Sequence, residues 1–223
     1  MTALTWLDDH RRELQGGLDA LRGDAGTVSR WARLLADRLV AGGRLLTVGN
    51  GGSAAEAQHL TSELVGRFLT ERRPFSAICL SAETSSLTAI VNDYGPDEMF
   101  ARQVEGHGRR DDVLMLLSTS GSSANVLRAA ERGHELGLHV WAMTGPAPNP
   151  LQAASHDSLC VQAPSTAAVQ EVHLVAIHAL CAAVDAELAS LDGLVRRTTT
   201  KVAVPEAALP QTTKAATNGR WSA

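Results

Sequence analysis

Apolar residues recur at helical spacing over residues 4–21 and 27–41, and Gly42-Gly43 follows the second segment. Beyond it, short apolar runs alternate with further helical patterns. The runs have the length of buried strands and cover residues 44–48, 77–80, 113–117, 140–143 and 158–161. The helical patterns share an apolar stripe and cover residues 53–68, a stretch around Ala89, 97–105, 123–136, a short turn near Leu151, and 166–191.

This alternation of strands and helices predicts an α/β fold with a parallel sheet covered on both faces, because each crossover must return across the sheet. Residues 1–191 are expected to form a single domain, with residues 1–43 as helices that pack on it and on neighbouring subunits. We expect Ser53 to cap the helix that follows it, and residues 92–96 to form a turn. Residues 192–223 are polar with few large apolar side chains, which predicts a disordered tail, with docking on a partner subunit as the alternative.

Composition narrows the class of protein. The 223 residues are 44% hydrophobic and carry a formal net charge of −4, which gives no electrostatic case for nucleic acid or an anionic membrane. Residues 1–15 lack the apolar core of a signal peptide, and no uninterrupted apolar run approaches the roughly 18 residues of a spanning helix. Cys79, Cys160 and Cys181 lie in apolar runs, so we interpret them as buried thiols of a cytoplasmic protein.

Two loops, each between a predicted strand and a predicted helix, are the candidate ligand sites. The first is Gly49-Asn50-Gly51-Gly52-Ser53, and the second is Ser118-Thr119-Ser120-Gly121-Ser122-Ser123. Loops of this kind present backbone N–H groups and hydroxyls to phosphate at the start of a helix. Neither has the spacing of a dinucleotide fingerprint or a nucleotide P-loop. The alternative is an ordinary tight turn with helix capping.

His59 and Glu63 are four residues apart and therefore lie on one face of a predicted helix. Gln170 and His178 interrupt the apolar face of the last helix, where polar groups need partners. These four side chains could surround one divalent ion or one reacting sugar, although a salt-linked pair on a helix surface is the simpler reading of His59 and Glu63. Glu171 and His173 lie outside the helix face that carries Gln170 and His178.

Six ordered segments resemble the sugar isomerase (SIS) domain family, and within it the sedoheptulose 7-phosphate isomerases. They are Gly49-Asn50-Gly51-Gly52-Ser53, Gln58-His59 through Glu63, Gly66-Arg67-Phe68, Asn92-Asp93-Tyr94-Gly95, Ser118-Thr119-Ser120-Gly121, and Gln170-Glu171-Val172-His173 with His178. The likeness covers residues 4–188. It implies a three-layer αβα sandwich with a five-stranded parallel sheet, preceded by helices, and a homotetramer with active sites at subunit boundaries.

The resemblance also implies roles for single residues. Glu63 and His178 match the family's acid/base pair, and His59, Glu63, Gln170 and His178 match a site for one Zn²⁺ per subunit. The matching substrate-binding positions, several of them in the two loops, are Asn50, Gly51, Gly52, Ser53, Glu63, Arg67, Asn92, Asp93, Ser118, Thr119, Ser120, Ser123 and Gln170. Ala167-Ala168 depart from an Asp-Arg pair of some members, which leaves the fine substrate preference open.

The implied reaction converts D-sedoheptulose 7-phosphate to D-glycero-D-manno-heptose 7-phosphate through an enediol, the first step toward ADP- or GDP-heptose. Such chemistry needs a carboxylate base at carbon and a proton donor or electrophile at oxygen. Three alternatives stay open at this point: an isomerase for another phospho-sugar, a non-catalytic tetramer that binds the replication initiator protein, and a sugar-sensing module of a transcription factor. The presence of both Glu63 and His178 argues against the non-catalytic relative.

Overall fold

The computed structural model describes residues 2–199, with side chains through residue 191. Residues 1–189 form one compact unit and residues 190–223 a second. The sheet and the candidate site lie in the first unit.

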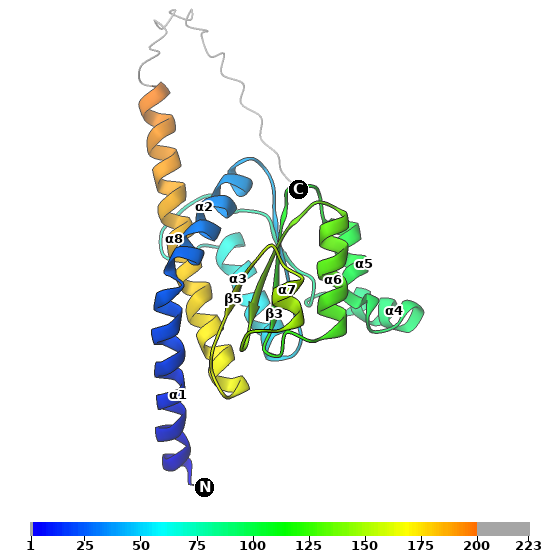
Figure 1. The fold of residues 1–223 in the computed structure, drawn as a ribbon. Helices are drawn as coiled ribbons and strands as arrows, with labels where there is room; N and C mark the ends of the chain where they lie inside the picture. Colours follow the sequence, from blue (N-terminus) through cyan, green and yellow to red (C-terminus); the bar gives the residue numbers. More distant parts are fainter. Residues whose placement is uncertain (1, 200–223) are drawn as a thin grey trace, which may run out of the picture. The chain divides into compact units, whose positions relative to one another are not determined.

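Five parallel strands form one sheet in the order β2-β1-β3-β4-β5, as expected from the alternating pattern (Figure 1). The strands are β1 Leu45–Gly49, β2 Ala77–Cys79, β3 Val113–Ser118, β4 His139–Thr144 and β5 Asp157–Cys160. Gly49 pairs with Leu117, and Ser118 pairs with Thr144. The loops that follow β1, β3 and β4 therefore emerge side by side at the carboxyl edge of the sheet, where open α/β sheets bind ligands.

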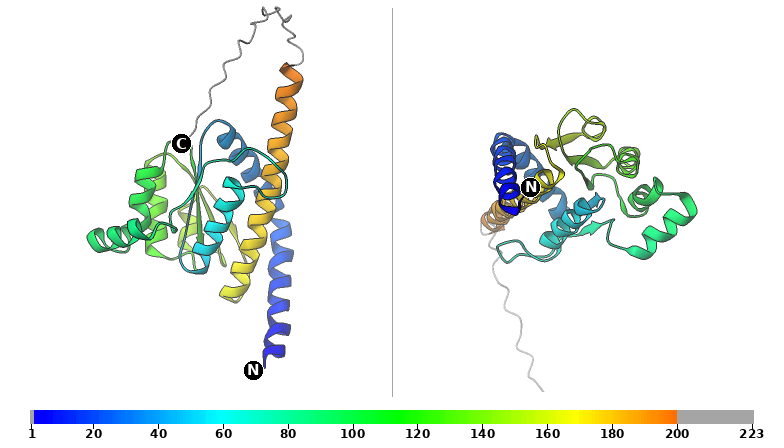
Figure 2. Two further views of the ribbon diagram at one scale, coloured as in Figure 1. Left: turned by 180° about the vertical axis from the view of Figure 1, so that it is seen from behind. Right: turned by 90° about the horizontal axis from the view of Figure 1, so that it is seen from below.

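Helices cover both faces of this sheet, which confirms the three-layer architecture. They are α1 Ala3–Gly23, α2 Ala25–Val40, α3 Gly52–Val65, α4 Thr84–Tyr94, α5 Glu98–His107, α6 Ala124–Glu135, α7 Pro150–Ala153 and α8 Thr166–Thr199. The views of Figure 2 place α3 and the part of α8 that belongs to the first unit on one face, and α5 and α6 on the other. The two N-terminal helices lie on the α8 side.

Successive strand residues point to opposite faces and so build two cores. One core joins alternate residues of β1, β3 and β4, such as Leu46, Leu114 and Val140, to α5, α6 and α7. On the other face, Trp31 of α2 stacks on Trp141 of β4 with ring centroids 4.9 Å apart. The strands are buried on both faces, which explains why they read as continuous apolar runs.

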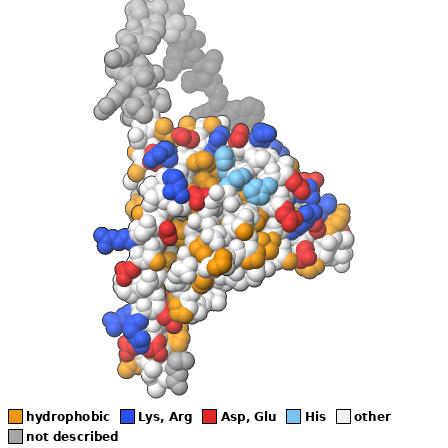
Figure 3. All heavy atoms as spheres, viewed as in Figure 1, with side chains coloured by type: hydrophobic (Ala, Val, Ile, Leu, Met, Phe, Trp, Pro, Cys, Tyr) orange, Lys and Arg blue, Asp and Glu red, His pale blue; other side chains and the backbone are white. Residues whose placement is uncertain are grey.

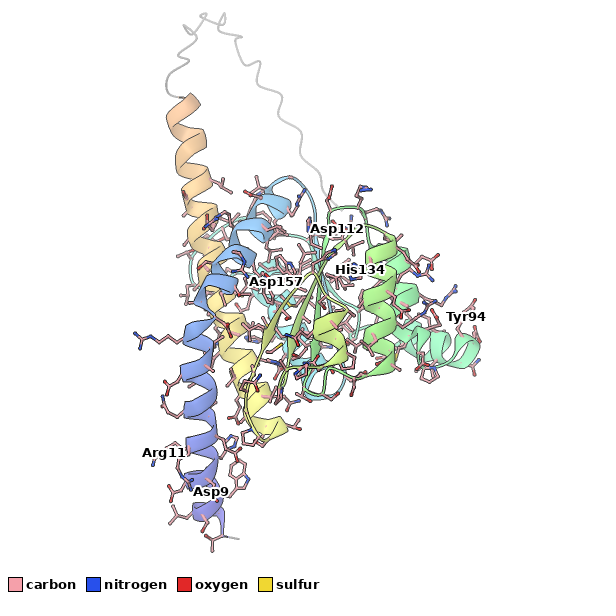
Figure 4. The ribbon with its side chains drawn as sticks, in the orientation of Figure 1. Asp9, Arg11, Tyr94, Asp112, His134 and Asp157 are labelled. Atoms are coloured by element: carbon pink, nitrogen blue, oxygen red, sulfur yellow. The ribbon has the colours of Figure 1, made fainter. Side chains whose placement is uncertain are left out.

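Two carboxylates, the buried Asp112 and the partly exposed Asp157, organise the amino-terminal edge of the sheet, opposite the loops. Asp112 accepts the backbone N–H groups of Arg44 and Arg109, and Asp157 accepts the indole N–H of Trp31 (Figure 4). These contacts join the segments that precede the strands. The polar side chains of this edge thus serve to hold segments of the fold together, and the candidate ligand loops lie at the carboxyl edge.

The structure corrects three local predictions. Residues 92–94 end α4 rather than forming a turn, and the chain reverses only at Gly95, whose φ of +86° favours glycine. Gly51 is the N-cap of α3, so Ser53 lies inside the first turn. Helix α8 continues through Gly193 to Thr199 instead of ending at residue 191, and no further glycine or proline follows in residues 194–199 to stop it. The rest of the predicted tail, residues 200–223, lies outside the described residues.

Within the part of the chain that the structure describes, one stretch, Thr166–Leu191, is long and apolar enough to cross a membrane by length and composition. A core helix meets the same criterion, and Val172, Ile177 and Val184 of this stretch are buried in the first unit. Cys79 and Cys181 are buried as predicted, whereas Cys160 is only partly covered.

Candidate active site

A small polar cavity of about 70 Å³ lies where the loops after β1 and β3 meet α8. Its lining is dominated by hydroxyl and amide side chains from both loops and from the start of α8: Asn50, Ser53, Leu117, Ser118, Thr119, Ser120, Ser123 and Gln170. Seven of the predicted substrate-binding residues thus come together. No cationic side chain is among these lining residues, so neutral donors carry the site.

The cavity is rich in hydrogen-bond donors. The hydroxyls of Ser118 and Ser123 approach within 3.4 Å, and Ser118 Oγ also accepts the N–H of Gly121. Among the described residues, no side chain caps the first turns of α3 and α6. Helix N-termini carry free N–H groups and a partial positive charge. Two such ends beside serine hydroxyls suit the terminal oxygens of a phosphate.

Asn50 and Asn125 form a reciprocal amide pair that joins the two loops. Asn50 Nδ2 donates to Asn125 Oδ1 at 2.9 Å, and Asn125 Nδ2 donates back to Asn50 Oδ1 at 3.1 Å. Asn125 is not among the residues predicted to bind substrate. Its only signal was an amide in the first turn of the helix after the serine loop, and its partner lies 75 residues away.

Gln170 closes the cavity against the glycine loop. A Cβ built on Gly52 would lie 2.1 Å from Gln170 Nε2, so any larger residue here would displace the Gln170 amide from this position. Gly51 needs glycine for another reason, because its φ is +55°. The two glycines therefore let the loop turn and let α8 contact it. This places Gln170 in the cavity, while its predicted part in a metal site stays a prediction.

His59, Glu63 and His178 form a second cluster, with one donor atom from each within 4.8 Å of the others. His59 Nε2 is 2.9 Å from His178 Nε2 and 3.3 Å from Glu63 Oε1. One ring nitrogen of the histidine pair must donate and the other accept. The spacing also matches tetrahedral ligands that each bind one ion at 2.0–2.1 Å, which lie about 3.3 Å apart.

Neighbouring side chains hold this cluster in place. Phe68 stacks on the ring of His178, with centroids 5.6 Å apart. Burial, together with the nearby carboxylates of Glu63 and Asp185, raises the pKa of the Cys181 thiol to about 12. Cys181 is therefore a neutral thiol beside the cluster and is not a nucleophile. The reactive groups of the cluster are therefore the carboxylate of Glu63 and the imidazoles of His59 and His178.

Three predicted substrate-binding residues lie outside both groups. Arg67 is mostly exposed and donates to the carbonyl of Leu69. Asn92 donates to Asp93, and both stand at the end of α4 next to Tyr94, which Figure 4 shows on the side of α5 away from the sheet. Within one chain, the structure therefore gathers the serines in the cavity and the acid/base pair in the second cluster, and places these three residues in neither.

Another group of histidines is visible on the face drawn in Figure 3. The rings of His134 and His156 have centroids 4.4 Å apart. His156 Nδ1 accepts the backbone N–H of Val140, and His134 Nε2 donates to the carbonyl of Ala154. A neutral His156 then carries its hydrogen on Nε2 and has no lone pair left for a metal. This group is structural.

Known proteins resemble this chain over most of its length. The sequence model of the SIS domain family matches residues 11–145. The phosphoheptose isomerase of Streptomyces coelicolor is 64% identical over 179 residues, which are 80% of this chain and 78% of that protein. The structure of phosphoheptose isomerase from Neisseria gonorrhoeae matches with a TM-score of 0.76 and 38% identity, covering 83% of this chain and all of that one.

A phosphoheptose isomerase from Francisella tularensis gives the same TM-score of 0.76, with 33% identity over 83% of this chain and 99% of that one. These identities are higher than a shared fold alone requires. The matched region contains both the polar cavity lined by the serines, hereafter the serine cavity, and the cluster of His59, Glu63 and His178. The chain belongs to the phosphoheptose isomerases of the sugar isomerase (SIS) domain family.

Proposed function

We propose that this isomerase binds sedoheptulose 7-phosphate with its phosphate in the serine cavity and its first two carbons at Glu63 and His178. The observation that carries the proposal is the pairing of two sites of different chemistry. One offers neutral donors at two helix N-termini, and the other offers a carboxylate beside two imidazoles. A phosphorylated ketose has both kinds of partner, a dianion at one end and an acidic C–H at the other.

Glu63 is suited to be the base. Its side chain is only 17% exposed and stands at the last turn of α3, next to His59. The carboxylate takes a proton from C1 of the ketose and returns it to C2, while the proton of the C1 hydroxyl moves to the C2 oxygen through His178. The enediol forms between the two transfers, and no atom is gained or lost.

The same cluster fits a metal ion. Two imidazole nitrogens and a carboxylate oxygen are ordinary Zn²⁺ ligands, and their mutual distances suit a single ion. His59, Glu63 and His178 would hold it, with the amide oxygen of Gln170 as a fourth donor. When bound, Zn²⁺ would polarise the sugar oxygens as a Lewis acid. Ligation and proton transfer compete for Glu63 and His178, so metal dependence separates the two roles.

We further propose a cytoplasmic homotetramer in which a neighbouring subunit completes the site. Arg67, Asn92 and Asp93 match substrate-binding positions of the family yet lie away from the cavity of their own chain. Exposed apolar residues on α1, including Leu4 and Leu7, favour burial against another copy. The free cysteines suit a reducing compartment.

The test is turnover of sedoheptulose 7-phosphate by purified protein after chelation, with and without added Zn²⁺. Glu63→Gln should reduce kcat by at least about 1,000-fold, because the amide cannot accept the carbon proton. Its affinity for inorganic phosphate should stay within about threefold of wild type, since Glu63 is outside the serine cavity.

Glu131→Gln is the matched control, because Glu131 is an exposed glutamate of α6 paired with Arg128. It should leave turnover unchanged. Turnover by Glu63→Gln close to that of wild type would remove Glu63 as the base. Full activity after chelation would assign Glu63 and His178 to proton transfer, whereas activity restored only by Zn²⁺ would assign the cluster to the metal.

A further inference from the structure

Glu56 on α3 and His173 on α8 are buried ionisable residues that the proposed chemistry does not use. The side chain of His173 is fully buried, and that of Glu56 is 11% exposed. Their facing atoms, His173 Nδ1 and Glu56 Oε2, are 3.7 Å apart. Neither atom has a hydrogen-bond partner among the residues that the structure describes. Burial of unpaired polar atoms is costly, and native proteins rarely keep two facing each other.

The opposite side of the imidazole determines where its hydrogen lies. His173 Nε2 is 3.1 Å from the carbonyl oxygen of Thr144, which can only accept, so Nε2 carries a hydrogen. A neutral His173 then presents a lone pair on Nδ1 to the Glu56 carboxylate, which also only accepts. One added proton, on Nδ1 or on Oε2, converts this repulsion into a charge-assisted or neutral hydrogen bond.

Each residue of this pair lies one helical turn from a residue that lines the serine cavity. Glu56 follows Ser53 by three residues on α3, and His173 follows Gln170 by three residues on α8, so each is one helical turn away. The pair also connects to a third cavity residue, Thr119. His173 donates to the carbonyl of Thr144, and the next residue, Gly145, donates its N–H to the carbonyl of Thr119 at 3.1 Å. The pair thus joins α3, α8 and the end of β4.

We propose that Glu56 and His173 share one buried proton and form a bridge that positions Ser53, Gln170 and Thr119 around the phosphate. Neither residue lines the cavity, so both are positioning residues. The bridge rests on the proposed function in one respect, that phosphate occupies the cavity. Its consequence is specific: loss of the bridge loosens three walls of the phosphate site and leaves Glu63 and His178 in place.

The experiment compares Glu56→Ala with Glu56→Gln, using calorimetric binding of inorganic phosphate and the steady-state constants for sedoheptulose 7-phosphate. Glu56→Ala should weaken phosphate binding and raise KM by about 10-fold, with kcat changed less than about threefold. Glu56→Gln should bind phosphate nearly as wild type does, because its amide N–H donates to Nδ1 without an added proton. Glu187→Ala, which removes a more exposed carboxylate from α8, should change neither constant.

Equal loss of phosphate binding in both Glu56 variants would overturn the bridge, as would unchanged binding in Glu56→Ala. If Glu56→Ala does not fold, ¹⁵N-histidine NMR of the wild-type protein decides. A protonated or hydrogen-bonded Nδ1 of His173 supports the bridge, and a free lone pair contradicts it. If phosphate binding ranks as expected while the wild type fails to isomerise the ketose, the proposed function fails and the bridge stands.

Discussion

Replacement of Arg72 by methionine tests how the end of α3, and with it Glu63, is held. Arg72 Nε donates to Asp185 Oδ1 on α8 at 2.8 Å, and both side chains are about nine-tenths buried. The same guanidinium donates to the backbone carbonyls of Glu63 at 2.6 Å and Leu64 at 3.0 Å. Arg72 therefore caps the helix that presents the proposed base and ties it to the helix that presents His178.

Arg72→Met leaves Asp185 as a buried charge without its cation. Breaking a buried pair by removal of one partner costs about 3–5 kcal/mol. For a unit of this size, each kcal/mol lowers the melting temperature by roughly 2–4 °C, so a fall of roughly 6–20 °C is expected. The loss of the cap should also lower kcat, because Glu63 would no longer have a fixed position relative to His178.

The assay is thermal unfolding at one protein concentration, with kcat measured on the same samples. The double variant Arg72→Met/Asp185→Leu should be more stable than Arg72→Met alone, because it buries no unpaired charge. Arg73→Met is the control, since Arg73 is the exposed neighbour and should shift the melting temperature by no more than about 2 °C. A melting temperature of Arg72→Met equal to that of Arg73→Met, or a double variant less stable than Arg72→Met, would refute this reasoning.

Two further outcomes follow from the glycine loop and from the histidines. Gly52→Ala should weaken phosphate binding in calorimetry, because its Cβ would lie 2.1 Å from Gln170 Nε2, whereas Gly16→Ala, with nothing within 4 Å, should not. Equal binding by both variants would contradict the close contact. Burial lowers the pKa values of His139 and His156. The folded state then resists protonation of both rings, so stability to urea should be greatest above pH of about 6.5 and fall below it. A His156→Gln variant should lose less stability on acidification, and an unchanged pH dependence would count against this role.

Much of the fold could be predicted from local pattern. Apolar runs of strand length alternate with helical stripes, and this order alone requires a parallel sheet with helices on both faces. The errors were local as well. Asn92 and Asp93 resemble turn residues, yet they complete α4 before Gly95 reverses the chain. Their turn preference is weak compared with the helix that precedes them, which continues until a glycine permits positive φ.

For the candidate site too, some features could be predicted from local sequence pattern and others depend on the tertiary structure. The sequence by itself determined the two loops at the carboxyl edge and the shared face of His59 and Glu63, because chain direction and helical periodicity decide both. Only the tertiary structure decided which remote groups meet. His59 finds His178 across 119 residues, and Glu56 faces His173 from another helix. Such contacts depend on how helices pack against the sheet, and packing joins residues whose separation along the chain carries no periodic signal.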